Sequence, residues 1–323
     1  MLTVRTVADL RAALGPFRRA GRRIGLVPTM GALHEGHLSL LRRARGECDL
    51  VVMSLFVNPR QFDQAADLRA YPRDEARDSE LAAEAGVDVL FAPAREEVYP
   101  PGFVTTVSVG GPAEGLESEH RGRGHFDGVA TVVAKLLGMV GPQVAYFGEK
   151  DAQQLAVVRR LVADLDIPCA IAACPTIRDP DGLALSSRNA RLSATERARA
   201  TVLYAALESV RATVADGERD PVAATATGRA LVAAAGAELE YLALVDPATF
   251  APLDELDRDA LAVIAARVGP VRLIDNLRVP VRSGGEPPDA PTPAFRSGSH
   301  PPTASPHPDH AAATPAPAQA RTA

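Results

Sequence analysis

The sequence contains no run of about 18 apolar residues, the minimum that a helix needs to cross a bilayer. Its first residues, Met1–Thr6, lack the charged-then-apolar pattern of a secretory signal. The spacing of its three cysteines, Cys48, Cys169 and Cys174, is typical of neither a disulfide framework nor a zinc site. These absences predict a cytoplasmic protein without a membrane segment, whose thiols are reduced and buried as small apolar groups.

The chain also lacks an excess of positive charge, because 35 Lys and Arg against 40 Asp and Glu give a formal net charge of −5. Domains that bind nucleic acid usually carry a basic face that neutralises backbone phosphates, so no nucleic-acid partner is expected. A small anionic ligand needs only a few local cations. The chain is rich in apolar residues, at 46% of 323, and can bury the cores of two domains.

Residues 6 to about 175 alternate helical and strand-like segments. Periodicity predicts strands at 23–27, 50–57, 87–91, 144–147 and 167–173 and helices at 6–20, 36–46, 74–85, 127–139 and 151–164. This alternation predicts an α/β domain over 1–175, with a parallel sheet covered by helices on both faces. Such sheets bind ligands outside the carboxyl ends of their strands.

The pattern changes near residue 176. Ala-rich helical stretches at 194–214 and 221–236 precede strand-like runs at 239–245, 261–267 and 271–278. This order predicts a smaller α+β domain over 176–281. Residues 282–323 contain no Leu, Ile, Val or Met, so they cannot bury enough apolar surface to offset their ordering entropy and are predicted to be disordered.

The segment Pro28-Thr29-Met30-Gly31-Ala32-Leu33-His34-Glu35-Gly36-His37 follows the predicted strand at 23–27 and leads into the next helix. Its glycines allow a phosphate to approach the backbone, and free N–H groups at the helix start attract an anion. Two histidines three residues apart can point toward one bound group. The alternatives are partly exposed loop histidines or a metal site, which lacks a third ligand at a recognisable spacing.

Two further loops carry candidate phosphate ligands. In Gly148-Glu149-Lys150-Asp151-Ala152-Gln153-Gln154, Lys150 either meets phosphate or faces solvent, and Asp151 can cap the next helix. Gln154 lies one turn later and faces the same predicted cleft. In Asp181–Asn189, the hydroxyls of Ser186 and Ser187 with the guanidinium of Arg188 can hold a triphosphate, or the segment is an interdomain turn.

A fourth segment, Phe56-Val57-Asn58-Pro59-Arg60-Gln61-Phe62, lies at the end of the predicted strand at 50–57. Asn58 and Gln61 place neutral amides in the predicted cleft, with Met30 and Phe56 as apolar neighbours.

Together these segments resemble the pantothenate synthetase (pantoate–β-alanine ligase) family of the HIGH/KMSKS nucleotidyltransferase superfamily. The resemblance runs from about Thr6 to Arg278. Its motifs, in the family's order, are Pro28–His37, Phe56–Phe62, Tyr71–Arg73, His125–Val129, Gly148–Gln154 and Leu185–Asn189. Each motif alone is weak, but six in order argue strongly against an accidental match.

The resemblance implies a Rossmann-like N-terminal domain, a smaller C-terminal lid domain and a homodimer. It implies that pantoate attacks the α-phosphorus of Mg-ATP to give pantoyl adenylate and pyrophosphate, and that β-alanine then displaces AMP. ATP as a substrate and Mg²⁺ are therefore expected. The ATP-binding residues would be Met30, Gly31, Ala32, Leu33, His34, Glu35, Gly36, His37, Gly148, Glu149, Lys150, Asp151, Ile177, Leu185, Ser186, Ser187 and Arg188. Gln61 and Gln154 would bind pantoate, Gln61 also β-alanine, and His37 would be the proton donor.

The chemistry of the reaction fits these assignments. Negative charge grows on the bridging oxygen of the leaving pyrophosphate, so the candidate catalytic residues are His34, His37, Lys150 and Arg188. The carboxylate of pantoate is the nucleophile. Neutral glutamines would orient it without lowering its electron density as an arginine fork would.

The sequence departs from the family pattern in three places. The segment His120–Phe126 has a displaced arginine and no proline, which leaves open whether Arg121 or Arg123 acts in the site. Leu185 stands where Met is common, which is a volume-conserving change. Of the acidic residues suggested as metal ligands after Tyr71–Arg73, Asp78 is present, and Mg²⁺ is expected mainly on the ATP phosphates.

Other functions remain open on the sequence alone. A nucleotidyltransferase of the same superfamily that adenylates a phosphate group should need more cations than Phe56–Phe62 offers. An aminoacyl-tRNA synthetase is disfavoured by the acidic balance. A non-catalytic nucleotide-binding protein would not need both histidines, Lys150 and Arg188.

Overall fold

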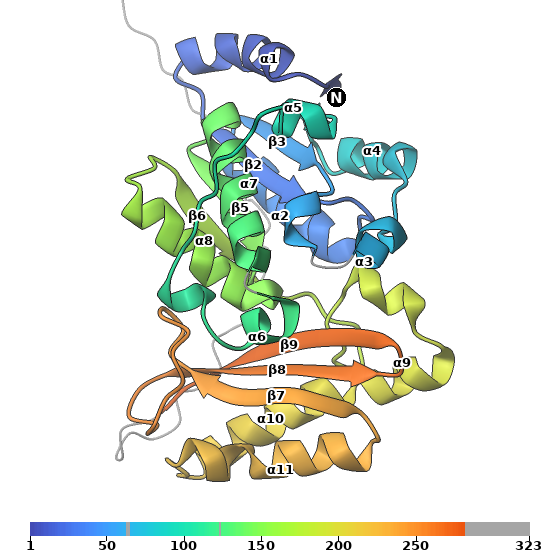
Figure 1. Ribbon diagram of the computed structural model, residues 1–323, viewed down its shortest axis with the longest axis vertical. Coiled ribbons are helices and arrows are strands. Elements are labelled where there is room, and N and C mark those ends of the chain that lie inside the picture. The colour runs from blue at the N-terminus through green and yellow to red at the C-terminus, as the bar shows by residue number, and fades with distance from the viewer. Residues whose placement is uncertain (63–64, 123, 282–323) are drawn as a thin grey trace, which may run out of the picture. The chain divides into compact units, whose positions relative to one another are not determined.

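A six-stranded parallel sheet lies at the centre of the N-terminal half (Figure 1). The computed structural model describes residues 1–62, 65–122 and 124–281. The strand order is β1-β4-β3-β2-β5-β6, and every neighbouring pair is parallel. The strands are β1 (Leu2–Val4), β2 (Ile24–Thr29), β3 (Leu50–Leu55), β4 (Val89–Phe91), β5 (Val144–Gly148) and β6 (Ala170–Cys174). The predicted α/β class with a parallel sheet is confirmed, although β1 was not predicted.

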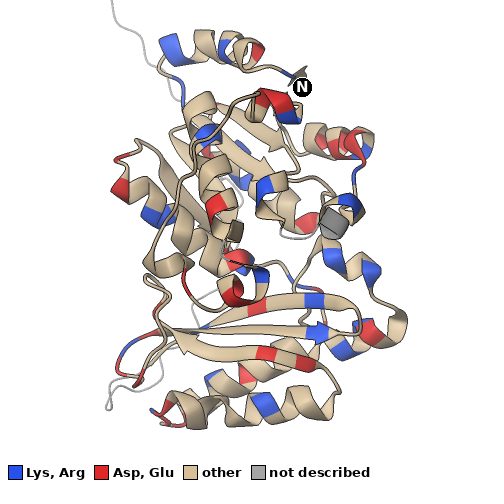
Figure 2. Ribbon diagram, in the orientation of Figure 1, with Lys and Arg blue, Asp and Glu red and all other residues tan. Residues whose placement is uncertain are grey.

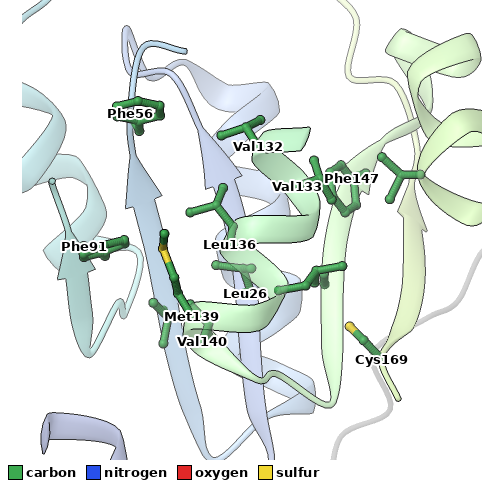
Figure 3. Packing of buried hydrophobic residues seen from close by; sticks show 14 of the residues in the cluster. Leu26, Phe56, Phe91, Val132, Val133, Leu136, Met139, Val140, Phe147 and Cys169 are labelled. Atoms are coloured by element: carbon green, nitrogen blue, oxygen red, sulfur yellow. The ribbon is translucent and has the colours of Figure 1, made fainter. Parts of the chain in front are cut away.

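Helices cover both faces of this sheet. The α-helices of the N-terminal half are α1 (Val7–Arg19), α2 (Glu35–Glu47), α3 (Ala65–Ala70), α4 (Glu75–Glu84), α5 (Arg95–Val98), α6 (Glu117–Arg121), α7 (Gly124–Val140) and α8 (Ala152–Asp164). Short 3-10 turns are η1 (Pro59–Gln61), η2 (Gly111–Ala113) and η3 (Glu149–Asp151). On one face, Leu136 and Val140 of α7 pack near Leu26 of β2 (Figure 3). On the other face, Leu41 of α2 packs with Val27, the next residue of β2. Consecutive strand residues are therefore buried on opposite faces, which explains the continuous apolar runs.

A three-stranded antiparallel sheet forms the second part, as the sequence predicts. Its strands β7 (Glu238–Val245), β8 (Ala260–Val268) and β9 (Val271–Val279) pair in chain order. The helices that accompany it are α9 (Ala194–Ala200), α10 (Val202–Ala215) and α11 (Pro221–Ala234), preceded by the 3-10 turn η4 (Ser187–Arg191). One face of the sheet buries Ile264 against Leu207 of α10, and the other places Val263 against Ala156 of α8. Both halves thus share an apolar contact.

Two of the departures from the predicted boundaries have local chemical reasons. The strand predicted at 167–173 begins only at Ala170, because Pro168 has no N–H to donate to a ladder. The helix predicted at 194–214 is broken at Thr201, whose hydroxyl donates to the carbonyl of Ala198 at 2.8 Å. The predicted tail, residues 282–323, lies outside the described residues.

Charged residues of both signs are interspersed along the helices and across the second sheet (Figure 2). Within that sheet the acidic Glu240 of β7 pairs with Arg267 of β8 and Arg272 of β9. No helix in the described ranges has the length and apolar character that spanning a membrane requires.

Candidate active site

A cleft opens at the carboxyl ends of β2, β3 and β5, where the sequence predicts ligand binding. Residues Thr29, Phe56 and Phe147 line it from the parallel sheet, and Tyr241 and Val263 line it from the second sheet. Its interior holds a cavity of about 260 Å³. Ordinary ligand pockets measure about 300–1,000 Å³, so the cavity is near the lower end of the range for small-molecule sites.

Most of the predicted site residues come together in this cleft. Those that line it are Met30, His34, Gly36, His37, Gln61, Gly148, Lys150, Asp151, Gln154, Ile177, Leu185, Ser186, Ser187 and Arg188. Five predicted residues, Gly31, Ala32, Leu33, Glu35 and Glu149, do not line it. The side chain of Leu33 is buried in the core, and the carboxylates of Glu35 and Glu149 pair with Arg42 and Arg278.

The two histidines begin α2 and cap its first turn. The N–H of Gly36 donates to Nδ1 of His34 at 3.1 Å, and the N–H of His34 lies 3.4 Å from Nδ1 of His37. Because a backbone N–H can only donate, these Nδ1 atoms carry lone pairs, and in the neutral rings the protons sit on Nε2. The ring centroids are 4.2 Å apart. The pair therefore offers two N–H donors rather than two acceptors.

Burial keeps both rings neutral. It lowers the pKa of His34, helped by the charge of Lys150. It also lowers the pKa of His37 to about 3, helped by His34. In the ligand-free site at neutral pH, His37 can therefore donate a hydrogen bond, whereas it carries no extra proton to transfer.

Two N–H groups of the loop before α2 are engaged by a carboxylate. The buried carboxylate of Asp78 accepts from the N–H of Ala32 at 2.9 Å and of Leu33 at 2.8 Å. Gly31 has a φ of +88°, and a Cβ there would lie 2.7 Å from the same carboxylate, which explains the glycine. Asp78 thus fixes the loop, because each of its carboxylate oxygens accepts a backbone N–H.

Positive charge gathers around one carboxylate in the cleft. Burial raises the pKa of Asp151, but Lys150, Arg188 and Arg121 outweigh it and hold that pKa below its ordinary value. Burial, aided by Arg121, lowers the pKa of Arg188. The interpretation of Asp151 as a side-chain cap of α8 is wrong, because its side chain makes no capping hydrogen bond.

The segment with the two serines is held as a turn beside these cations. The N–H of Leu185 donates to the carbonyl of Ile177 at 2.9 Å and closes the base of a hairpin. Oγ of Ser186 accepts from the N–H of Arg188 at 3.2 Å, which starts η4. A serine hydroxyl that accepts in this way can still donate its proton to a ligand.

Another part of the cleft carries neutral amides. Asn58 is buried and donates to Oε1 of Gln61 at 3.0 Å and to the carbonyl of Gly128 at 3.0 Å, while its Oδ1 accepts from the Tyr99 hydroxyl at 2.9 Å. Nε2 of Gln61 lies 3.1 Å from Sδ of Met30. This network fixes the Gln61 amide beside an apolar wall.

His125 contacts the backbone of Gln61 in this part of the cleft, and its protonated nitrogen is Nδ1, unlike that of His34 and His37. Its Nδ1 lies 2.8 Å from the carbonyl oxygen of Gln61. A carbonyl can only accept, so Nδ1 carries the proton and Nε2 carries the lone pair. Burial, aided by Arg121, lowers the pKa of His125 to about 4. This histidine stands in the motif His125–Val129, which by itself does not assign it a role in the site.

A buried ion-pair network borders the cleft between the two sheets. Glu117 of α6 accepts from Arg121 at 2.6 Å, from Arg272 of β9 at 2.9 Å and from the Tyr241 hydroxyl of β7 at 2.7 Å. Burial raises the pKa of Glu117, but Arg272 and Arg121 outweigh it and hold that pKa far below its ordinary value. Arg121 therefore lines the cleft as a partner of Glu117, and Arg123 lies outside the described residues.

Sequence reasoning did not assign several residues that line the cleft. Tyr71 and His125 stand inside quoted motifs, so the signal was present. Tyr241, Asp275 and Asn276 come from β7 and β9, far along the chain, where no local motif marks them.

The described residues contain no group of three or more His, Cys, Asp and Glu side chains placed to hold a metal ion. Two acidic residues of the cleft, Glu117 and Asp275, are paired with arginines. All three cysteines are free thiols and buried, as predicted.

The fold and the cleft define a nucleotide-binding α/β protein whose ligands meet at the carboxyl edge of a parallel sheet. The family model for pantoate-beta-alanine ligase matches residues 2–278. The chain belongs to the pantoate–β-alanine ligase family.

Relatives and solved structures agree with this assignment. The chain is 56% identical to pantothenate synthetase of Cereibacter sphaeroides over 277 residues, which is 85% of this chain and 99% of the relative. Pantothenate synthetase from Thermus thermophilus superposes with a TM-score of 0.82 at 50% identity, over 86% of this chain and 99% of that one. A pantoate-beta-alanine ligase from Francisella tularensis, complexed with beta-gamma ATP and beta-alanine, gives a TM-score of 0.72 at 35% identity over 86% and 97%.

Proposed function

We propose that the cleft joins pantoate to β-alanine at the expense of ATP through a pantoyl adenylate. The protein is a ligase of this kind by its family. The observation that carries the residue assignment is the grouping of side chains that line the cleft. The charge of Lys150 acts on His34, His37 and Asp151, and Arg188 acts on the same Asp151. Gln61 contacts Asn58 and Met30.

In the first step, a carboxylate oxygen of pantoate bonds to the α-phosphorus of ATP. The bond from that phosphorus to the bridging oxygen breaks, and pyrophosphate leaves with the electron pair. Lys150 and Arg188 stabilise the charge that grows on the leaving group. The Nε2–H groups of His34 and His37 add hydrogen bonds, and triphosphate charge favours protonation of His37 once ATP is bound.

Gln61 and Gln154 orient the nucleophile. An amide N–H can hold a carboxylate oxygen without the charge pairing that would weaken its attack. Gln61 is pre-set for this task, because its side chain contacts Asn58 and Met30 and its carbonyl accepts from His125. In the second step, the amine of β-alanine attacks the acyl carbon, the bond to AMP breaks, and the nitrogen loses a proton.

Mg²⁺ fits this cleft as an ion carried on the ATP phosphates. Asp78, the carboxylate that the family resemblance suggested, is committed to the loop N–H groups. Asp151 lines the cleft beside Lys150. Its carboxylate would be the protein group that contacts an Mg²⁺ ion bound to the phosphates. When bound, Mg²⁺ supplies charge neutralisation of the triphosphate.

We propose further that residues 1–175 and 176–281 act as two domains, with the second serving as a lid over the nucleotide. The buried contacts between them, from Glu117 to Arg272 and Tyr241, support a defined closed position. We also propose a homodimer that works in the cytoplasm, which agrees with three free thiols.

The proposed order of steps is tested by exchange of labelled pyrophosphate into ATP. Exchange should require pantoate but not β-alanine, because the carboxylate must be activated before an amine can displace AMP. Exchange that needs β-alanine would contradict a free-standing adenylate step. Exchange without pantoate would point to another acceptor.

A further inference from the structure

Two neighbouring residues of β9, Asp275 and Asn276, hold both phosphate-binding segments of the cleft. They are 4% and 8% exposed. Asn276 contacts the segment that contains Lys150, and Asp275 contacts the hairpin that leads to Arg188. The two residues belong to the second sheet and lie more than a hundred positions from Lys150.

The amide of Asn276 is fully used as a donor. Its Nδ2 donates to the carbonyl of Glu149 at 2.8 Å and to the carbonyl of Lys150 at 2.9 Å. An amide nitrogen has two hydrogens, and both are engaged here. If the amide were flipped by 180°, its oxygen would face the carbonyl oxygens of Glu149 and Lys150, and such oxygen atoms cannot donate to one another. The orientation of this side chain therefore fixes the peptide on each side of the Lys150 Cα.

Asp275 fixes the other segment through Arg178. Its two carboxylate oxygens accept from Nη1 and Nη2 of Arg178 at 2.6 and 2.9 Å. The same guanidinium donates to the carbonyl of Gly182 at 3.0 Å and lies 4.3 Å from the centre of the Tyr204 ring. Arg178 thus holds the hairpin that closes between Ile177 and Leu185, directly before Ser186–Arg188.

The two contacts are joined within β9. The N–H of Asn276 donates to Oδ1 of Asp275 at 2.8 Å, and Arg178 donates to the carbonyl of Asn276 at 3.0 Å. A shift of either phosphate-binding segment therefore strains the contact to the other.

We infer that Asp275 and Asn276 are positioning residues that set Lys150 relative to Arg188 for the leaving pyrophosphate. The inference rests on the proposed function, since it assigns these cations to that leaving group. It predicts a selective defect. Pyrophosphate is present only in the first step, so loss of the contact should slow adenylate formation far more than amide formation.

The test measures both half-reactions on the full-length protein. One assay follows pantoate-dependent exchange of pyrophosphate into ATP, and the other follows conversion of supplied pantoyl adenylate with β-alanine. In Asn276→Ala, exchange should fall about 10–10²-fold, the scale of a misplacement of about 1 Å. The second half-reaction should stay within about threefold of the parent, because the positioned charges act on pyrophosphate.

Asn276→Asp separates hydrogen bonding from packing. Aspartate keeps the size of asparagine but has no hydrogen to donate while ionised. It should slow exchange at least as much as Asn276→Ala does. Exchange at the parent rate in Asn276→Asp, or equal slowing of both half-reactions in either variant, would overturn the inference.

Two further variants complete the design. Arg278→Gln removes an exposed contact of β9 to the side chain of Glu149, 3.5 Å in length, and should leave both half-reactions within about threefold of the parent. Arg178→Lys keeps the charge but loses the fork, and should show the same selective defect if the Asn276 variants do not fold. If the parent protein shows no pyrophosphate exchange, the proposed function is contradicted. If the parent shows exchange and Arg178→Lys shows it at the same rate, only the inference is contradicted.

Discussion

Nδ1 of His34 accepts the N–H of Gly36 at 3.1 Å, so a ring that lines the cleft also caps helix α2. A Cβ on Gly36 would lie 2.8 Å from this ring, so the glycine is needed for the contact. The cap uses Nδ1 as its acceptor, so the proton of the neutral ring sits on Nε2, the donor that the proposed first step uses. Helix capping and ligand binding thus depend on the same ring orientation.

Replacement of His37 by Ala should slow formation of pantoyl adenylate about 10²–10³-fold, the scale of removing one preorganised donor from a developing oxyanion. Supplied pantoyl adenylate should react with β-alanine at a rate closer to that of the parent, because pyrophosphate is absent from that step. Single-turnover measurement of both steps gives the comparison. Equal losses would mean that His37 positions the adenylate generally.

His37→Gln provides the matched control for this prediction. A glutamine amide can place an N–H near the position of Nε2, whereas alanine cannot. We expect adenylate formation in His37→Gln to be faster than in His37→Ala and slower than in the parent. The same rate in both variants would show that the donor of His37 is not what the first step uses.

Gly128→Ala should destabilise the fold and disturb the part of the cleft that carries neutral amides. A Cβ at Gly128 would lie 2.2 Å from the carbonyl oxygen of Arg60, the residue before Gln61. Overpacking of this kind costs about 1–3 kcal/mol. Because η1 must move, the KM for pantoate should also rise. Urea unfolding and steady-state kinetics measure the two effects.

Gly138→Ala is the control on the same helix, since a Cβ there meets nothing within 4 Å. Alanine has the better helix propensity, so this variant should be as stable as the parent or more stable by up to about 1 kcal/mol. A similar loss of stability in both variants would show that any alanine in α7 is harmful. The close approach to Arg60 would then not be the cause.

The sequence predicts most of the parallel sheet because its strands are continuous apolar runs and its helices are amphipathic. It does not predict β1, because Leu2–Val4 is a strand of 3 residues, too short to show periodicity, and acquires its place by pairing with β4. Motifs at strand ends likewise predict the histidines, Lys150 and Arg188. These signals are local in the chain.

The remaining parts of the site depend on contacts between distant segments. Asp78 accepts from the N–H of Ala32, 46 positions away in the chain. Asn276 donates to the carbonyls of Glu149 and Lys150, 127 and 126 positions away. Backbone groups have no sequence signature, so a residue that serves them cannot be recognised from its neighbours. The ring nitrogen that carries the proton in each histidine was also hidden, because a sequence gives no ring orientation.

Deletion of residues 282–323 should leave turnover and melting temperature nearly unchanged. The family match ends at residue 278, and the deleted part lies outside the described residues and contains no Leu, Ile, Val or Met. A polar segment of this composition contributes little burial. A fall of several degrees in the melting temperature of the shortened chain would show that this part docks on the remainder.

Stability should fall as the pH drops below neutrality, and His125 should account for part of the loss. Its pKa is lowered from 6.5 to about 4 by burial, so the unfolded chain binds the proton more readily than the folded one. The stabilisation is therefore present above pH 6.5 and is lost as the pH falls toward 4. At about 1.4 kcal/mol per pKa unit, this residue should contribute a loss of about 2 kcal/mol between pH 7 and pH 5.

His125→Asn isolates this contribution, because the asparagine amide can still donate to the carbonyl of Gln61 but does not titrate in this range. Urea unfolding of parent and variant at pH 7 and pH 5 gives four free energies. The free energy of unfolding should fall less in the variant than in the parent, by about 2 kcal/mol. The other buried ring, His37, whose pKa is lowered to about 3, remains in both proteins and should cause equal further losses in each. If the two proteins lose the same stability between pH 7 and pH 5, His125 is not held neutral by its burial. The lone pair assigned to its Nε2 in the cleft would then have to be given up as well.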